Sequence, residues 1–300
     1  MITDQDPVEP AKSIRAVFDA AEVEGFLHVR DLDGDDEVCY GSDDKVVLAS
    51  VFKIPIALEY ARQAASGRLD RAGRHVVTDA DKAGDGIGTD GCMHDVEMSA
   101  RDLAAMMMTM SDNAATDVVL GLVGRENVRA TLDELDCRAT AVTGCKELLS
   151  SVVTDLGIDP AAEDVEEQLA RVTPDRMRMV TVRDPERTAS TTPREITKLL
   201  AAIWRDEAGP AEACAEVREI MGRQIWPHRL SSGFEDEIRV SGKTGTLWGV
   251  RNEAGVVEYP DGKRYAVGVF LRSESMGYRL PRADAAIGRA ARVAIDHLRS

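Results

Sequence analysis

The chain has 300 residues, of which 44% are hydrophobic and 30% charged, and its formal net charge is -16. This length can bury the core of one large domain or of two interlocked lobes, and the balance is that of a soluble globular protein. The negative charge argues against a nucleic-acid partner or an anionic membrane surface, because a polyanion would repel this protein. Composition leaves the oligomeric state open.

The start of the chain and its cysteines bear on the compartment. The first ten residues contain neither the basic segment nor the apolar run of a secretory signal, and no apolar stretch approaches the length of a membrane span. The five cysteines are scattered, with no CxxC spacing. We therefore expect reduced thiols in a cytoplasmic protein. No motif predicts a metal site or a cofactor.

The first part of the chain predicts a helix, a hairpin and a second helix. Apolar residues recur at helical spacing over 11–24. Two strand-like stretches follow, and the turn-forming sequence "LDGDDE" separates them. A largely apolar helix then begins near Ser50, with Pro55 in its first turn. This helix should be buried on most sides.

The middle of the chain predicts mainly helices. "SARDLAAMMMTM" and "AATDVVLGLVG" are separated by "SDN", and "ENVRATLDELD" continues as helix. Residues 138–193 combine short helical pieces, prolines and acidic patches, and they form either a wall of the active site or an insertion. Two more helices are predicted in "PREITKLLAAIWRD" and "AEVREIMGRQI".

The last part of the chain predicts three strands and an amphipathic helix. The sequence "YPDGKRY" is typical of a hairpin turn. The order of elements predicts an α/β (α+β) fold, in which an antiparallel sheet from both chain ends is flanked by helices and carries an inserted all-helical lobe. We predict a discontinuous sheet domain over 1–50 and 194–300, a helical lobe over 51–193, and an active site at their junction.

The sequence "RVSGKTGTLWG" (239–249) contains "GKT", the end of a phosphate-binding P-loop. A P-loop needs another glycine five residues before this one, and Glu237 stands there. A strand-like sequence follows where a P-loop has a helix. Without the first glycine the backbone N–H groups cannot wrap a phosphate, so a nucleotide site is a poor explanation.

The alternative is a set of three motifs, S-x-x-K, S-D-N and K-T-G, in that order. The chain has "SVFK" at 50–53, "SDN" at 111–113 and "KTG" at 243–245. Each motif alone is weak, but all three in order and in the expected structural context are a strong signal. Over nearly its whole length the chain resembles the superfamily of serine β-lactamases and penicillin-binding proteins, and within it class A β-lactamases.

Ser50 and Lys53 carry the predicted nucleophilic chemistry. They stand three residues apart at the start of a helix, which puts both side chains on one face. A serine becomes a good nucleophile when a neighbour takes its proton, and a lysine in a water-poor pocket can be that neighbour. Without the other motifs, a structural lysine at a helix start would be the better explanation of the pair. With them, Ser50 is the predicted nucleophile.

The resemblance implies roles for the second motif and for the third motif's lysine. Ser111 would relay a proton to the leaving nitrogen, and Asn113 would hold an amide of the substrate. Lys243 would place positive charge near Ser111 and near an anionic group of the substrate. Asp112 would brace the turn or cap the following helix.

The resemblance also implies roles along the strand that holds the third motif. Thr244 and Thr246 would bond a substrate carboxylate or carbonyl, and the backbone N–H groups of Ser50 and Thr246 would form an oxyanion hole. Gly245 would leave room for a substrate along the strand. Arg251 would pair with a substrate carboxylate, or it is a surface arginine.

One feature of class A enzymes is missing from this sequence. They deacylate through the glutamate of an "ExxLN" motif, which this chain lacks. Glu147, in "KELLSS", lies at nearly the family's spacing from Ser111, and it is the candidate for this base. Its context differs, however, and the segment from Glu147 to Thr192 is longer than the family's loop. An ordinary acid on a helix surface is the simpler explanation.

The sequence therefore predicts a serine hydrolase that forms an acyl-enzyme at Ser50. Its substrate would be a small molecule, a β-lactam or a related amide or ester that carries a carboxylate. The alternatives are an esterase or acyltransferase of a biosynthetic pathway with little β-lactamase turnover, and a β-lactam-binding protein. A non-catalytic scaffold and a nucleotide binder rank behind these.

Overall fold

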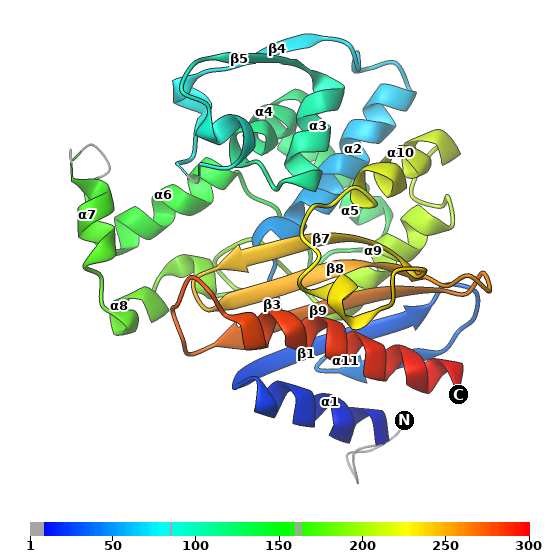
Figure 1. Ribbon diagram of the computed structural model, residues 1–300. Helices are drawn as coiled ribbons and strands as arrows, with labels where there is room; N and C mark the ends of the chain where they lie inside the picture. Colours follow the sequence, from blue (N-terminus) through cyan, green and yellow to red (C-terminus); the bar gives the residue numbers. More distant parts are fainter. Residues whose placement is uncertain (1–8, 85, 160–161, 163) are drawn as a thin grey trace.

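The computed structural model describes residues 9–84, 86–159, 162 and 164–300 (Figure 1). Residues 1–8, on which part of the expectation about a leader rests, lie outside the described residues. The helices are α1 (Glu9–Ala20), α2 (Lys53–Ala65), α3 (Ala100–Thr109), α4 (Asn113–Val123), α5 (Arg125–Glu134), α6 (Cys145–Asp155), α7 (Val165–Ala170), α8 (Pro174–Arg178), α9 (Pro193–Trp204), α10 (Ala211–Met221) and α11 (Pro281–Arg299). No described helix is long and apolar enough to cross a membrane.

Strands from both ends of the chain form one antiparallel sheet, as predicted. The strands are β1 (Val23–Asp31), β2 (Glu37–Tyr40), β7 (Arg239–Leu247), β8 (Val250–Glu258) and β9 (Arg264–Ser273), in the order β2-β1-β9-β8-β7. The first strand of the chain pairs with the last, and Phe26 lies opposite Phe270. Two short pairs complete the strands: β3 (Val46–Val47) with β6 (Ser190–Thr191), and β4 (Arg74–Val77) with β5 (Val96–Ser99).

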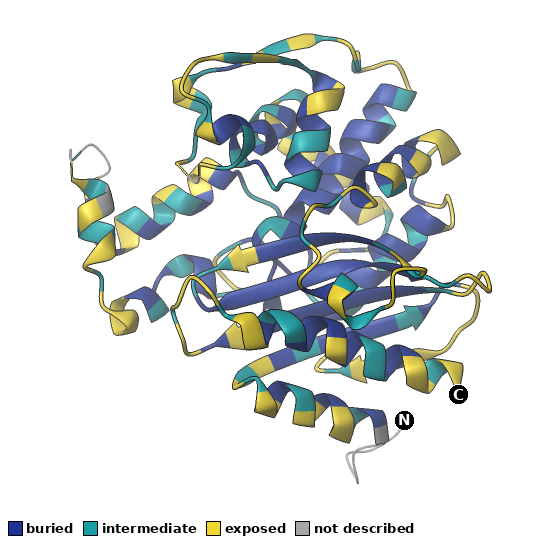
Figure 2. Cartoon of the chain, viewed as in Figure 1, coloured by how far each residue is buried: buried dark blue, intermediate teal, exposed yellow. Residues whose placement is uncertain are grey.

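Helices cover both faces of the sheet. On one face α1 packs beside α11, and on the other α9 packs against β1 and β9 (Figure 1). The buried residues of α11 recur every three or four positions, as an amphipathic helix requires. Because neither face meets water, β8 is buried along nearly its whole length rather than at alternate residues (Figure 2).

The helix that begins next to Ser50 forms the centre of the helical lobe. Eleven residues of α2 are buried, and α3, α4, α5 and α10 pack around it (Figure 2). The prediction of a helix buried on most sides is confirmed, and Pro55 lies in the first turn. α10 belongs to the chain after residue 194, so that part of the chain also covers the lobe. The division into domains stays a prediction.

The segment from residue 145 to 192 contains three α-helices, and its end pairs with the chain that leads to Ser50. α6 packs against α4, and in Figure 1 α6, α7 and α8 lie along one side of the molecule. The segment ends near β6, whose pairing with β3 fixes the chain three residues before Ser50. Leu48 also donates its backbone N–H to Ala189 O at 2.9 Å.

Candidate active site

The first two motifs meet at the amino group of Lys53. Its Nζ lies 2.6 Å from Ser111 O, 3.3 Å from Ser111 Oγ and 2.7 Å from Asn113 Oδ1. The side chain of Lys53 is fully buried. An ammonium has three N–H donors, so these three acceptors satisfy it. As a neutral amine it would keep two donors and offer a lone pair to a neighbouring hydroxyl.

The backbone around the two motif serines has an unusual conformation. Ser50 lies in η1 (Ala49–Phe52), a short 3-10 helix that leads into α2. Ala49 and Ser111 have φ values of 46° and 68°, and they are two of five non-glycine residues with positive φ in the described part of the chain. Such conformations cost free energy and concentrate at functional sites.

Asp112 holds the turn that carries Ser111. It is fully buried, and its Oδ1 caps α4 by accepting the backbone N–H of Ala115 at 2.9 Å. Its Oδ2 accepts the N–H and the hydroxyl of Thr89, at 2.6 and 2.8 Å. Both predictions for Asp112 are therefore confirmed, since it caps a helix and also ties the turn to the loop before β5.

Lys243 brings a second buried lysine to the site. Its side chain is fully buried, and in the described part of the chain its Nζ donates to Thr244 O alone, at 3.0 Å. Burial holds the pKa of Lys243 well below its usual range, and the nearby charge of Lys53 lowers it further. An anionic group of a ligand beside Lys243 would raise its pKa again.

Gly245 lies against the backbone that precedes Ser50. A Cβ at this position would come within 2.6 Å of Leu48 O and 3.2 Å of the Cβ of Ala49. The sequence predicted a glycine here to leave room for a substrate. The structure supplies a different reason, because the glycine lets β7 approach the chain that positions Ser50.

β7 is an edge strand, so alternate N–H groups point away from the sheet. Thr244 donates its N–H to Gln224 Oε1 at 2.6 Å, which fixes the outward direction for this residue. Alternation gives the N–H of Thr246 the same direction. This geometry agrees with the oxyanion hole implied by the resemblance, whose other member is the N–H of Ser50.

Sequence analysis missed Arg229. This buried arginine donates to Gly245 O at 2.9 Å, to Asn252 O at 3.0 Å and to Thr246 Oγ1 at 2.7 Å. Its Nε donates to Asp284 Oδ1 of α11 at 2.8 Å. No local signal in "IWPHRL" marks it, because its partners come from β7, β8 and α11.

Arg251 is buried, so the alternative of a surface arginine is wrong. Its guanidinium donates to the backbone oxygens of Leu247, Val250 and Tyr278, at 3.0, 2.8 and 2.7 Å. It also lies 3.5 Å from Asp284 Oδ1. These contacts favour a structural role that joins β7 and β8 to the chain before α11. Pairing with a substrate stays a prediction.

Glu147 lies on the first turn of α6 and is exposed. Its Oε2 is 2.5 Å from Nη2 of Arg125, and the hydrogen bond from Arg125 lowers the pKa of Glu147. A general base that activates water near neutral pH needs the opposite shift, which burial normally provides. The contacts of Glu147 are those of an acid on a helix surface.

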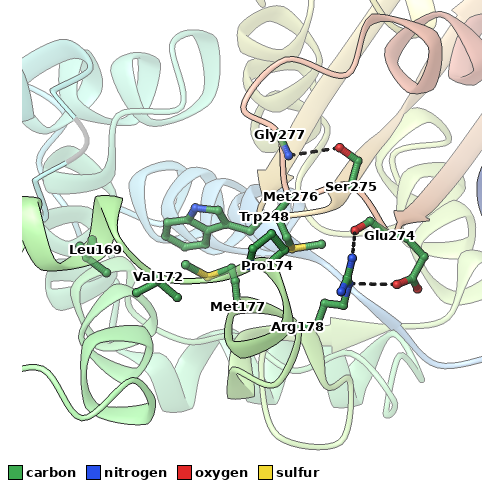
Figure 3. Close-up of a pocket in the computed structure, with 10 residues that line it drawn as sticks. All are labelled: Leu169, Val172, Pro174, Met177, Arg178, Trp248, Glu274, Ser275, Met276 and Gly277. Atoms are coloured by element: carbon green, nitrogen blue, oxygen red, sulfur yellow. Dashed lines mark hydrogen bonds and ion pairs between the residues drawn. The ribbon is translucent and has the colours of Figure 1, made fainter.

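A cavity of about 480 Å³ lies beyond the end of β7 (Figure 3). Its walls come from α7, α8 and the chain between β9 and α11, and Trp248 enters it directly after β7. Leu169, Val172, Met177 and Met276 line it together with the ion pair of Arg178 and Glu274 at one side. The segment 145–192 therefore forms a wall of a cavity beyond the end of β7.

One group of possible metal ligands lies at the opposite sheet edge. The ligand atoms of His28, Glu37 and Cys39 are within 4.8 Å of one another. The guanidinium of Arg194 occupies this place, with Nη1 2.6 Å from Glu37 Oε1 and Nη2 3.4 Å from Cys39 Sγ. A cation of the chain itself thus fills the position that a metal would need.

Comparisons with known proteins agree with this geometry. A sequence model described as the β-lactamase enzyme family matches residues 9–298. The chain is 28% identical over 307 residues to the β-lactamase regulatory protein BlaB of Streptomyces cacaoi, with 96% of this chain and 97% of that protein covered.

The fold also matches solved structures. A mutant of PBP-A, in an acyl-enzyme complex with penicillin G, has a TM-score of 0.75 and 19% identity, with 99% of each chain covered. A β-lactamase from Sphaerobacter thermophilus has a TM-score of 0.74 and 24% identity, with 95% of this chain and 97% of that one covered. At these identities the likeness establishes the fold alone. The family model establishes more: the chain belongs to the β-lactamase enzyme family.

Proposed function

We propose that the protein is an acyl-serine hydrolase whose nucleophile is Ser50, and that it acts on a β-lactam or a related amide or ester. One observation carries the proposal. The amino group of Lys53 bonds both Ser111 and Asn113, so two motifs far apart in the sequence meet three residues along the chain from Ser50. The third motif adds the buried Lys243 to the same site.

The proposed acylation needs only groups of this chain. Ser50 Oγ attacks the carbonyl carbon and its proton passes to Nζ of Lys53 in those molecules where this amine is unprotonated, while the carbonyl oxygen takes up the negative charge between the N–H groups of Ser50 and Thr246. The carbon–nitrogen bond then breaks, and its electron pair stays on the nitrogen. Ser111 gives its proton to that nitrogen and regains one from Lys53, whose Nζ is 3.3 Å from Ser111 Oγ.

The charges of the site favour a substrate with a carboxylate. Lys243 is fully buried with one hydrogen bond in the described part of the chain, and Arg229 donates a hydrogen bond to Thr246 of the same strand. An anion beside these groups would restore the charge of Lys243 and gain charge-assisted hydrogen bonds. The acyl substituent of such a substrate would extend along β7 toward the cavity beside Trp248.

A second candidate is a protein that binds β-lactams and releases them slowly. Deacylation needs a base that activates water, and Glu147 is exposed and paired with Arg125. A relative that spans the whole chain bears the name of a β-lactamase regulatory protein. An esterase or acyltransferase is the remaining alternative, since a nucleophile other than water could take the acyl group.

The test is intact-protein mass after mixing with a penicillin and, separately, with a small activated ester. The adduct is followed over time, and Ser50→Ala is the control. A transient penicillin adduct with product release supports a β-lactamase. A lasting penicillin adduct supports the binding protein, unless rapid ester turnover accompanies it and favours the esterase or transferase. Absence of any adduct on the native protein with both reagents contradicts the proposal.

A further inference from the structure

A buried glutamate lies on β8, the strand that pairs with β7. Glu253 is on β8, opposite Thr244 of β7, and it is fully buried. A Cβ on Gly242 would lie 2.5 Å from Glu253 Oε1, so the glycine of the "GKT" sequence is needed to make room for this carboxylate. A carboxylate in such a place requires partners.

Both oxygens of Glu253 accept hydrogen bonds from the chain that precedes β7. Oε1 accepts Nε2 of Gln224 at 2.7 Å, and Oε2 accepts the backbone N–H of Leu230 at 2.7 Å. Two accepted N–H bonds are the pattern of an ionised carboxylate. Glu253 thereby ties both ends of residues 224–230 to the sheet.

The segment that is hydrogen-bonded to Glu253 also forms hydrogen bonds with β7. Gln224 accepts the outward N–H of Thr244 at 2.6 Å. Arg229, next to Leu230, donates to Gly245 O at 2.9 Å and to Thr246 Oγ1 at 2.7 Å. Glu253 is therefore connected to three successive residues of β7, and Thr246 supplies an N–H of the proposed oxyanion hole.

Glu253 also bears on the charge of Lys243. The charged groups and the thiol that act on Lys243 are Lys53, Arg229, Glu253 and Cys145. Lys53 and Arg229 lower the pKa of Lys243, whereas Glu253 raises it. Burial raises the pKa of Glu253 itself, and the hydrogen bonds of Leu230 and Gln224 oppose this shift.

We propose that Glu253 is a positioning residue of the acylation site. Through Gln224 and Leu230 it holds the edge strand β7 at the place where Lys243 and the N–H of Thr246 serve the reaction. This inference rests on the proposed function, since it assigns Glu253 a part in the acylation of Ser50.

Three variants test whether Glu253 positions β7. Glu253→Gln keeps the shape but sets an N–H donor against Leu230 or Gln224, and it removes the charge. Gln224→Met, at a partly exposed position, frees the N–H of Thr244 but keeps the charge of Glu253. Glu59→Gln is the matched control, because Glu59 is a buried acid that accepts Gln63 and Thr131 within the helical lobe.

The measurement is acylation by a penicillin in stopped flow, with the acylation rate constant and the dissociation constant of the initial complex determined from pH 6 to pH 10. We expect Glu253→Gln and Gln224→Met to lower the rate constant by about tenfold to a hundredfold, with a smaller change in the dissociation constant. Glu253→Gln should also move the basic limb of the profile to lower pH. Gln224→Met should leave the limb in place, and Glu59→Gln should change neither quantity.

A native rate and profile in Glu253→Gln would overturn the proposal, as would an equal loss in Glu59→Gln. Amide hydrogen exchange in the peptide of residues 239–248 provides a second test that needs no substrate. Glu253→Gln and Gln224→Met should both speed exchange there, and Glu59→Gln should not. If the native protein is not acylated, the proposed function fails. Unchanged exchange in both variants would then also refute the positioning role.

Discussion

The two edges of the sheet hold their charged groups in different ways. At the β2 edge, Arg194 forms ion pairs with Glu37 and Asp43, at 2.6 and 2.7 Å. At the β7 edge, Lys53 and Lys243 are fully buried, and in the described part of the chain none of their hydrogen bonds goes to a carboxylate. Paired charges serve structure, whereas an unbalanced buried charge is a feature of sites that bind or react.

The histidine at the β2 edge follows the same rule. His28 is fully buried, and burial together with Arg194 lowers its pKa to about 4. It therefore stays neutral among the ion pairs and needs no counter-charge. We therefore predict that substitutions at the β7 edge change the acylation rate strongly and can raise the free energy of unfolding. Substitutions at the β2 edge should lower the free energy of unfolding and leave acylation unchanged.

The largest expected effect is at Lys53. Lys53→Ala removes the proposed acceptor of the Ser50 proton and the donor to Ser111 and Asn113. We expect the acylation rate constant to fall by about 10³-fold, as for loss of a general base. Stopped-flow acylation by a penicillin measures it, with circular dichroism as the control for folding. Native kinetics in Lys53→Ala would exclude its role as the base.

Lys243→Met should slow acylation by about a hundredfold and yet stabilise the protein. The pKa of Lys243 in the folded protein is below its ordinary value of 10.5. Below pH 10.5 the unfolded chain binds a proton that the folded protein binds less readily, so this group favours unfolding. The destabilisation by Lys243 grows as the pH falls below 10.5 and vanishes above this pH.

We therefore expect Lys243→Met to raise the free energy of unfolding by about 2 kcal/mol at pH 7, and by less at pH 9.5. Denaturant titration at the two pH values measures the difference. A variant that is less stable than the native protein at pH 7 would mean that Lys243 is a paired structural charge. The contrast between the two edges would then be lost.

Arg194→Met tests the other edge. It removes ion pairs to Glu37 and Asp43 that are partly exposed, so salt screens them and each contributes little. We expect the free energy of unfolding to fall by about 1 kcal/mol, with acylation unchanged. Urea denaturation and stopped-flow acylation are measured on the same preparation. Slower acylation in this variant would show that the two edges are coupled.

Glu147→Gln should have the smallest effect. As an exposed acid paired with Arg125, Glu147 contributes about 0.5 kcal/mol or less to stability. We expect the lifetime of the penicillin adduct to be unchanged, and intact-protein mass over time measures it. A longer lifetime in the variant would make Glu147 the base that activates water, and it would favour a working β-lactamase.

Local patterns predicted much of this fold and the residues that meet at the site. Apolar spacing predicted the buried helix after Ser50, and the hairpin turn predicted the pairing of β8 with β9. Each of the three motifs can be recognised from a few adjacent residues. Their occurrence together predicted one common site, and Lys53 does lie within hydrogen-bond distance of Ser111.

Other features depend on contacts between distant parts of the chain, which no local pattern encodes. Arg229 and Glu253 acquire their partners only when residues 224–230 pack on β7 and β8. The reason for Gly245 also depends on a distant segment, since its neighbour is Leu48. Burial of Arg251 follows from the chain before α11.

Mapping the site of the penicillin adduct shows whether Ser50 is the nucleophile. Trypsin cleaves after Lys45 and Lys53, so it releases the peptide "VVLASVFK", in which Ser50 is the only hydroxyl residue. The protein is mixed with a penicillin, quenched in acid and digested, and the peptide masses are compared with those of Ser50→Ala. The account predicts the added mass on this peptide of the native protein alone. An adduct on another peptide, or the same adduct in Ser50→Ala, would contradict it.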